Sequence, residues 1–489
     1  MTGPCDRTGS GYRIVAVVLA LASPWLAACT TEDASSAEHP NAVTTSTPST
    51  TTKAAVPDTV TPRWATLLTG PSSEDEIDGV AAAPDGAVYL TGKFERSTTV
   101  GGQRLVSAGK ADIPLARFDR DGSPTWVRRF GGPGEDNFFD VDADGAGAVA
   151  AGIFEGTVAF DDITLTSAGS WDCVVVAFDP EGSVDWAGSF GGPGPDGCNE
   201  VALGRDGTVV TSLDTPGGWT SPAGKLPTNE GRDTLLLSID RDGTTNWGRL
   251  VGGPGSQRGK AIAVGPDGSI AFGGDTRDRV VIDDEVTEAP GRGADAWISR
   301  WSADGAHRWT RTWGGASDDI AKGLAFDEDG IYAVGTFGSA IDLAGVPLDA
   351  GPSTDLAVAR CDCDGELDWA TSVRADEPLA GAEVVTAADG GIVFAGRGAA
   401  GLAFASPSGE VVALDDRPGG TAFLVHFRPD GSVGLASTIA GTADAGADEI
   451  ARVGDRVYLD LVIRGSDNII NGNHLTADGK DGSLWALDL

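Results

Sequence analysis

Histidine, cysteine and carboxylate side chains carry most proton transfer, nucleophilic attack and metal binding in proteins, and this chain has only four histidines. His39 lies in a stretch rich in Ser and Thr, and His307, His426 and His474 lie far apart in the sequence. None stands in the order of a Ser-His-Asp triad or at the spacing of zinc ligands. The sequence therefore indicates no catalytic residue, no metal site and no cofactor, although an enzyme can still assemble carboxylates from distant loops.

Aspartates recur in the pattern Asp-x-Asp-Gly, starting at Asp119, Asp240, Asp327 and Asp362. Clustered carboxylates suit calcium, but a calcium loop needs about six to eight oxygen ligands, and none of these stretches continues into a longer Asp series or a trailing Glu. Asp and Gly are also the residues that β-turns use, Asp for local hydrogen bonds and Gly for positive φ. We therefore interpret the pattern as tight turns, with calcium as the alternative.

Cys29 follows two arginines, a short apolar run over residues 14–25 and the small residues of Leu26-Ala27-Ala28. The run is too short to span a bilayer as a helix, so residues 1–28 are interpreted as a cleaved export signal. The segment resembles a bacterial lipoprotein signal with its lipobox. That resemblance implies that Cys29 becomes the first residue of the mature chain and carries diacylglycerol on its sulfur. The alternative is an ordinary secretory signal in which Cys29 is incidental.

Residues 29–62 are expected to form a disordered tether behind this lipid anchor. From Thr30 to Pro62 the chain has 14 Ser or Thr and four Pro in 33 residues, too little apolar surface to offset the entropy of ordering them. Thr30 after the cysteine, rather than Asp, resembles the pattern that is sorted to the outer membrane of bacteria with two membranes. We therefore expect a lipid-anchored protein of the cell envelope; the sequence does not indicate which leaflet holds it.

Beyond residue 62 the sequence repeats with a period of about 61 residues. Tryptophan marks the same place in six copies, and Leu435 occupies it in the seventh. The six are Trp64, Trp126, Trp186, Trp247, Trp309 and Trp369. Each copy shows apolar alternation interrupted by Asp-Gly turns, which is typical of a meander of antiparallel strands. The middle two strands are long, as in "GTVAFDDITLTSAGSWDCVVVAFD", and predict a protruding β-finger on each blade.

The fold class follows from counting these strands. Third strands occur seven times and the chain ends after the last of them, whereas it begins with an unpaired fourth strand around residues 63–68. Pairing that strand antiparallel to residues 484–489 completes the last blade and leaves no free edge. The sequence therefore predicts, for residues 63–489, an all-β, seven-bladed propeller of four-stranded antiparallel blades, closed by its N- and C-terminal strands.

The strings "FGGPGEDNFFDVDADGAGAVAAG", "VGGPGSQRGKAIAVGPDGSIAFGG" and "WGGASDDIAKGLAFDEDGIYAVGTF" resemble the bacterial SBBP-type β-propeller repeat. The shared features are a Gly-Gly pair, acidic residues, an apolar strand and an Asp-Gly turn. Copies six and seven depart from this pattern. The resemblance implies export and a propeller fold, and it implies no reaction.

The repeat also gives a role to the tryptophans and to four cysteines. A tryptophan four residues beyond the turn glycine is similar to the docking tryptophans of other propellers, and we expect these rings to pack between blades. Cys173 starts a third strand and Cys198 starts the next first strand, so both lie at one rim and form a candidate disulfide. Cys361 takes the place of a core Phe; a bridge or metal site with Cys363 is not favoured.

Composition limits the classes of partner. The chain of 489 residues has 35 Lys and Arg against 72 Asp and Glu, a net charge of −37, which excludes unassisted binding to nucleic acid. We expect a monomeric, membrane-anchored binding or scaffolding module for a protein or glycan partner. The alternative is an exported hydrolase or lyase. Carboxylates converging on the propeller axis with raised pKa values would favour the enzyme, and carboxylates scattered in turns would favour the scaffold.

Lipidation at Cys29 is directly testable. Replacing Cys29 with Ser should move the protein from the membrane fraction to the soluble fraction of an expressing bacterium, because the thioether-linked lipid is the anchor. Mass spectrometry should find lipid on the wild-type chain and none on the variant. A variant that stays membrane-bound, together with an unlipidated wild type, would show that the lipobox interpretation is wrong.

Overall fold

The computed structural model describes residues 59–70, 75–226, 231–351, 353–398, 400–414, 421–439, 445–464, 468–470, 473–475 and 480–489. The predicted signal peptide, Cys29 and the tether as far as residue 58 lie outside these residues. Within the described ranges, no helix is long and apolar enough to cross a membrane.

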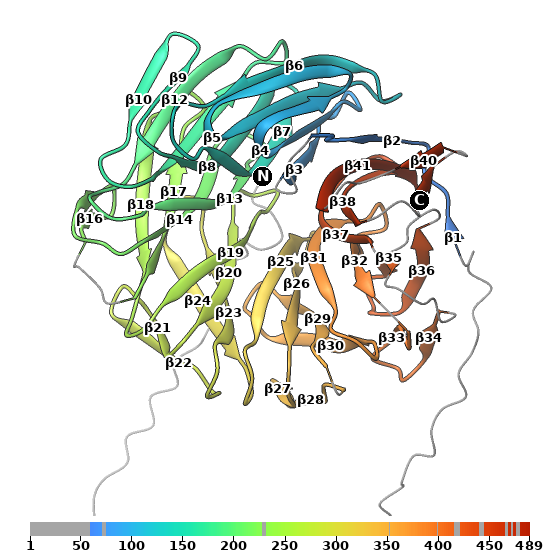
Figure 1. The fold of residues 1–489 in the computed structure, drawn as a ribbon. Helices are drawn as coiled ribbons and strands as arrows, with labels where there is room; N and C mark the ends of the chain where they lie inside the picture. Colours follow the sequence, from blue (N-terminus) through green and yellow to red (C-terminus); the bar gives the residue numbers. More distant parts are fainter. Residues whose placement is uncertain are drawn as a thin grey trace, which may run out of the picture.

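Seven four-stranded antiparallel sheets stand as blades around one axis, which confirms the predicted fold class (Figure 1). The first strands contact one another around the axis. These innermost strands are β3 (Glu76–Ala82), β7 (Asn137–Asp144), β13 (Gly197–Leu203), β19 (Gln257–Val264), β25 (Ile320–Phe326), β31 (Ala380–Thr386) and β37 (Ala445–Val453). The second strands are β4 (Val88–Val100), β8 (Gly147–Phe154), β14 (Val209–Thr215), β20 (Ile270–Thr276), β26 (Gly330–Phe337), β32 (Ile392–Gly398) and β38 (Arg456–Arg464).

The outer half of each blade completes the sheet. The third strands are β5 (Gln103–Phe118), β11 (Asp172–Phe178), β17 (Asp233–Ile239), β23 (Asp295–Trp301), β29 (Asp355–Asp362), β35 (Thr421–Phe427) and β41 (Lys480–Asp488). The outer strands are β6 (Pro124–Phe130), β12 (Val184–Phe190), β18 (Thr245–Val251), β24 (His307–Trp313), β30 (Leu367–Arg374), β36 (Val433–Ile439) and β2 (Trp64–Leu67). The turn face is the end that carries the first-to-second and third-to-fourth turns; the finger face is the opposite end.

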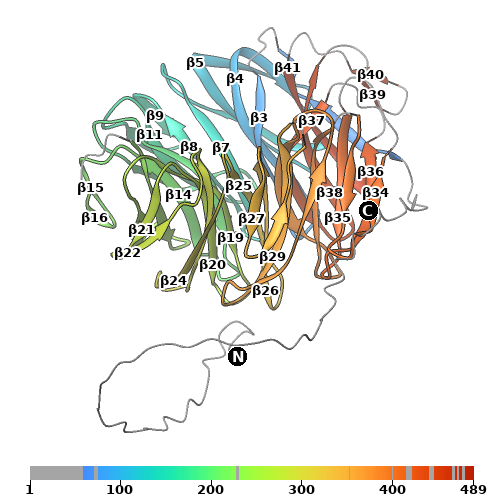
Figure 2. The same ribbon diagram turned by 90° about the horizontal axis from the view of Figure 1, so that it is seen from below.

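The predicted β-fingers are present between the second and third strands (Figure 2). In the first blade they are extensions of β4 and β5. In the others they are the pairs β9 (Thr157–Phe160) and β10 (Ile163–Thr166), β15 (Thr220–Ser221) and β16 (Gly224–Lys225), β21 (Arg279–Ile282) and β22 (Glu285–Glu288), β27 (Ile341–Leu343) and β28 (Val346–Leu348), β33 (Ala403–Ala405) and β34 (Val411–Ala413), and β39 (Asn468–Ile470) and β40 (Asn473–Leu475). Some fingers bond to the outer edge of the preceding blade. Val281 of β21 bonds to Gly252, and Phe404 of β33 pairs with Val373 of β30. These fingers cover edges that would otherwise be free to pair with other chains.

The blades are joined by tryptophans, as the repeat predicted. The indole N–H of Trp126 donates to the carbonyl of Pro180 in the next blade's turn at 2.9 Å. Gly182 of that turn has φ +86°, and a Cβ there would stand 2.9 Å from the ring, so only glycine fits. The six indole–carbonyl pairs are Trp64–Arg120, Trp126–Pro180, Trp186–Arg241, Trp247–Ala303, Trp309–Cys363 and Trp369–Pro429.

Leu435 of β36 is the exception that the closure explains. It faces the closing blade, whose third and fourth strands, β41 and β2, come from opposite ends of the described chain and share no turn. An indole at position 435 would lack the turn carbonyl that the six tryptophans use. Leucine therefore suffices to pack this seam.

The Gly-Gly and acidic residues of the repeat also have a structural role. The buried carboxylate of Asp136 accepts the backbone N–H of Gly132 at 2.7 Å, and Asp319 accepts that of Gly315 at 2.8 Å. Burial raises the pKa of both aspartates to about 6. The motif is thus a loop in which a carboxylate satisfies backbone N–H groups that no strand can satisfy.

Ring closure follows the predicted scheme. Strand β2 runs antiparallel to β41, with Trp64 opposite Ala486 and Leu67 opposite Ser483 (Figure 1). Arg63 forms an ion pair with Asp488 beside this junction. The partner segment is 483–486, slightly earlier than the predicted residues 484–489.

The predicted boundary of the tether is corrected by a short strand. Thr59 and Val60 form β1 (Thr59–Val60), which pairs parallel to β36 opposite Thr438 and Ile439. Val60 also packs on the apolar cluster of the last two blades. The tether was predicted to extend to residue 62 and to bury nothing, but two residues are too few to show a strand period in sequence.

A disulfide joins Cys173 of β11 to Cys198 of β13, with a Cα–Cα distance of 4.9 Å. Both cysteines are fully buried, and the bond links the second blade to the innermost strand of the third. Closing a loop of 25 residues stabilises the fold by roughly 3 kcal/mol on the chain-entropy model. Cys361 is a free, buried thiol whose pKa burial raises to about 12, so it forms no bridge with Cys363.

Two truncations test the closure. Deleting residues 63–70 removes β2 and Trp64, so it should lower the free energy of unfolding by several kcal/mol and open the edge of β41. Deleting residues 30–58 leaves β1, β2 and every described contact in place, and should leave the melting temperature unchanged. Equal melting of the two variants in calorimetry would contradict a closed ring.

Candidate functional site

An axial cavity of about 880 Å³ is lined by the turn-face halves of all seven innermost strands. Its wall is mixed, and polar atoms make up slightly more of the accessible lining than apolar ones do. The wall includes Val80, Val201, Ile262, Leu324, Val384 and Ile450. Charged residues such as Arg205 and Asp329 lie at the turns around its mouth. A volume of this size suits a small ligand or a few side chains of a larger partner.

Every innermost strand is interrupted by a β-bulge near its middle. The register shifts place the extra residues at Asp78, Phe139, Asn199–Glu200, Lys260, Lys322, Ala382–Glu383 and Asp448–Glu449. A bulge leaves a residue out of the ladder and re-aims its side chain. Six of the seven bulges contain a charged residue.

Four carboxyls converge on the axis beside these bulges. Asp140, Glu200, Glu383 and Glu449 come from blades on opposite sides of the ring, yet the charges of Asp140 and Glu383 each raise the pKa of Glu200. Burial is the largest cause of the raised pKa in all four groups. Lys260 opposes the shift at Glu200. Repulsion from Asp140 and Glu383 thus adds to burial at Glu200, and both favour its protonated form.

Some of these carboxylates also tie neighbouring blades together. Asp140 accepts the N–H of Val201 at 2.7 Å, and Glu383 accepts the N–H of Ile450 at 3.0 Å. Innermost strands of adjacent blades do not pair with each other, so N–H groups on their facing edges need other acceptors. These side chains therefore have a structural role as well as a place at the cavity.

Asp142, two residues further along β7, also accepts a backbone N–H of the next blade. Its carboxylate accepts the N–H of Leu203 at 2.8 Å and that of Ala143 at 2.7 Å. Burial outweighs these bonds and raises the pKa of Asp142 to about 6. The cavity thus combines aliphatic and polar groups along its wall with carboxyls whose pKa is raised.

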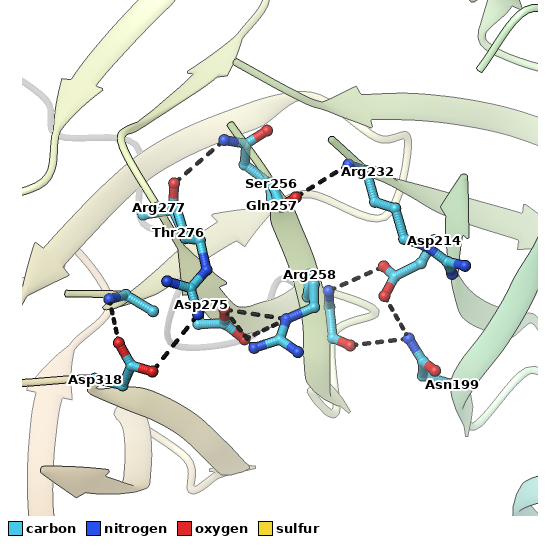
Figure 3. A network of polar contacts seen from close by, with 12 residues as sticks. Asn199, Asp214, Arg232, Ser256, Gln257, Arg258, Asp275, Thr276, Arg277 and Asp318 are labelled. Carbon is cyan, nitrogen blue, oxygen red and sulfur yellow. Dashed lines mark hydrogen bonds and ion pairs between the residues drawn. The ribbon is translucent and has the colours of Figure 1, made fainter. Parts of the chain in front are cut away.

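At the finger-face end of the axis, a second polar network joins the third and fourth blades (Figure 3). Arg258 forms a bidentate ion pair with the buried Asp275, with nitrogen–oxygen distances of 2.8 and 3.1 Å. Asp214 accepts the amide of Asn199 at 2.8 Å and the N–H of Gly259 at 3.2 Å.

The residues that the sequence offered for chemistry are not brought together. His307 contacts Thr310 at 2.8 Å, and His426 pairs with Asp389 at 3.1 Å in a different blade. His39 and Cys29 lie outside the described residues. His474 lies in β40.

The Asp-Gly turns behave as turns. Asp119 accepts the N–H of Asp121 and of Ser123, both at 2.9 Å, and Asp362 does the same in the fifth blade. Over the ranges that the structure describes, no group of three His, Cys, Asp or Glu side chains is placed to hold a metal ion. These hydrogen bonds are the ones that the turn interpretation predicts.

Sequence reasoning missed the axial carboxyls, although a signal for them exists. Most copies carry a charged residue just before the apolar half of the first strand, as in "CNEVAL", "GKAIAV", "AKGLAF", "GAEVV" and "ADEIA". Reading these positions together would have predicted a charged belt at the axis. The sign of that belt changes from blade to blade.

No family model matches the chain, so the resemblance to the SBBP-type repeat rests on its motifs alone. The chain is 28% identical over 173 residues to Regulatory protein FlaEY of Caulobacter vibrioides, a match covering 30% of this chain and only 18% of that protein.

Three solved structures show the breadth of the structural likeness. The Neurospora crassa Pan2 WD40 domain is 10% identical with a TM-score of 0.42, covering 88% of this chain and 97% of that one. The mitotic checkpoint complex is 11% identical with a TM-score of 0.45, covering 92% of this chain and 99% of that one. Puromycin hydrolase is 13% identical with a TM-score of 0.39, covering 87% of this chain and 57% of that one. Likenesses this distant say nothing about function.

The pH dependence of stability tests the proton-holding cluster. The pKa of Glu449 is raised by burial and by Glu383, so its contribution to stability is full below the unfolded pKa of about 4.3 and is lost as pH rises through the folded pKa. Glu449→Gln should therefore melt about 2–4 °C above the wild type at pH 8 and level with it at pH 4.

The matched control is Glu366→Gln, which changes the same charge in a turn where the side chain is 79% exposed. It should melt like the wild type at both pH values. If Glu449→Gln lowers the melting temperature at pH 8, ionisation of Glu449 does not destabilise the folded protein.

Proposed function

We propose that this chain is an exported, lipid-anchored protein whose propeller binds a polypeptide partner at the turn face, with a basic side chain of that partner entering the axial cavity. The observation that carries the proposal is the cavity itself: about 880 Å³, with aliphatic and polar groups along its wall and carboxyls around it. The aliphatic groups would pack against the methylene stem of Lys or Arg, and the carboxyls would receive its charged end.

The same chemistry disfavours a glycan at this site. Phe326 is the one aromatic residue in the cavity wall, and the six seam tryptophans have their rings against the next blade's turns. A sugar ring would find little aromatic surface to cover its apolar face. The strongly negative chain likewise favours a basic partner segment over nucleic acid.

The anchor completes the proposal. Lipid on Cys29 and the following tether would hold the propeller near a membrane of the cell envelope, free to meet other envelope proteins. A monomer fits this role, because the ring closes on itself and fingers cover part of its outer edge.

An exported hydrolase or lyase is the second candidate, and one observation favours it. Asp140, Glu200, Glu383 and Glu449 converge on the axis with raised pKa values, which is the arrangement that the sequence analysis set as the mark of an enzyme. Against it, Asp140 and Glu383 are engaged by backbone N–H groups. Glu383 and Glu449 also hydrogen-bond to each other rather than standing apart as an acid and a base.

Calorimetry with a pentalysine peptide tests the binding proposal. The full chain carrying Cys29→Ser should bind the peptide at low ionic strength, and Ala387→Trp, which fills the cavity mouth, should abolish most of that binding. Glu383→Gln should weaken it by about tenfold, because it removes an acceptor for the ammonium group. Glu366→Gln, with the same change of net charge on an exposed turn, should not.

Equal binding by the Cys29→Ser chain and its three variants would show that pentalysine responds only to the net charge of the protein, and the proposal would fail. Binding of a neutral oligosaccharide instead would favour the glycan partner. Cleavage of p-nitrophenyl glycosides that Glu383→Gln abolishes would favour the enzyme.

A further inference from the structure

Two carboxyl groups at the axial cavity hydrogen-bond to each other across a seam between blades. Glu383 lies in the bulge of β31 and lines the cavity. Glu449 lies in the bulge of β37, the innermost strand of the next blade, and its side chain bonds to that of Glu383. Glu383 also accepts the backbone N–H of Ile450 at 3.0 Å, which holds the two strands and the pair together.

A hydrogen bond between two carboxyl groups needs a proton, because an ionised carboxylate can only accept. The pair is therefore a carboxyl and a carboxylate that share one proton, and its ionisations belong to the pair rather than to either residue. Burial raises the pKa of both groups, and the charge of Glu383 adds to the rise at Glu449. Both effects favour the state of the pair that keeps this proton.

The groups around the pair are mostly acidic. The charges of Asp140 and Glu200 raise the pKa of Glu449, as that of Glu383 does. Asp460 lies on β38 opposite the bulge that holds Glu449, and burial raises its pKa as well. These acids oppose loss of the shared proton as long as no further cation is present. The other charged residues on the strands around the pair are Asp78 of β3, Asp142 of β7, Lys260 of β19, Lys322 of β25, Arg397 of β32, and Asp448 and Arg452 of β37.

We infer that a cationic side chain entering the axial cavity exchanges with the proton that Glu383 and Glu449 share, so that binding is coupled to release of a proton. The inference rests on the function proposed for the cavity and adds its regulation. In the exchange the ammonium group keeps its own protons, the carboxyl O–H bond breaks, and the proton leaves to the solvent as the pair becomes doubly ionised. By linkage, the affinity rises by up to about tenfold per pH unit over the range in which one proton is released.

Calorimetry in two buffers counts this proton. The probe is pentalysine with an acetylated N-terminus and an amidated C-terminus, whose side chains stay protonated near neutral pH because their pKa is about 10.4. The peptide is added to the full chain carrying Cys29→Ser at pH 6.2 in Mes and in Aces, which differ in their enthalpies of ionisation. The heats of binding should differ by the amount that uptake of about one proton by the buffer requires. The affinity should also rise between pH 5 and pH 8.

Glu449→Gln tests whether the pair is the source of the proton. This change removes the ionisable partner and leaves Glu383, which lines the cavity, in place. The new amide can donate the hydrogen bond that the shared proton makes in the natural pair. The variant should bind the peptide with little or no release of a proton, and its affinity should no longer rise with pH. Glu366→Gln, which changes the same charge on an exposed turn, should release the proton as the parent chain does.

Equal heats of binding in the two buffers would overturn the inference and leave the function proposed for the cavity standing. Release of a proton that persists in Glu449→Gln would also overturn it, because another group such as Asp140 or Glu200 would then be the source. If the parent chain binds no peptide in either buffer, the function proposed for the cavity is refuted and the coupling with it. The comparison of buffers on the parent chain needs no further variant.

Discussion

The docking of one tryptophan onto the turn of the next blade is the interaction on which the rest of this structure depends. Each indole closes its seam twice, with a hydrogen bond to a turn carbonyl and with ring contact over a turn glycine. This contact requires two residues in each copy of the repeat: a tryptophan in the outer strand and a glycine at positive φ in the turn. It also joins neighbouring blades at the turn face.

The centre of the ring follows from a different constraint. Innermost strands of neighbouring blades lie side by side without pairing, so their facing N–H groups need acceptors. Asp140, Asp142 and Glu383 supply them, and the bulges turn further carboxyls toward the axis. The cost is a crowded set of buried acids whose pKa values are raised.

Much of the fold could be predicted because the sequence repeats at a regular spacing. Spacing of 60 to 62 residues between tryptophans, a leading fourth strand and a trailing third strand together specify seven blades and their closure. The placement of Cys173 and Cys198 at one rim likewise follows from strand order, and the structure joins them. What could not be predicted depends on contacts across the ring or on very short segments.

The axial carboxyls come from four blades, and no spacing along the chain shows that they meet. Strand β1 has two residues and pairs only because the edge of β36 is there to receive it. Such features belong to packing between repeats rather than to the pattern within one.

Exchange of the six seam indole protons with deuterated water tests the central claim most directly, because each proton is held between two blades. The account predicts that the indoles of Trp64, Trp126, Trp186, Trp247, Trp309 and Trp369 all exchange far more slowly than an unbonded indole, with Trp64 protected like the rest. Rapid exchange at Trp64 alone would show that the seam between the closing blade and the first blade is open. Rapid exchange at all six would show that tryptophan docking does not hold the blades together.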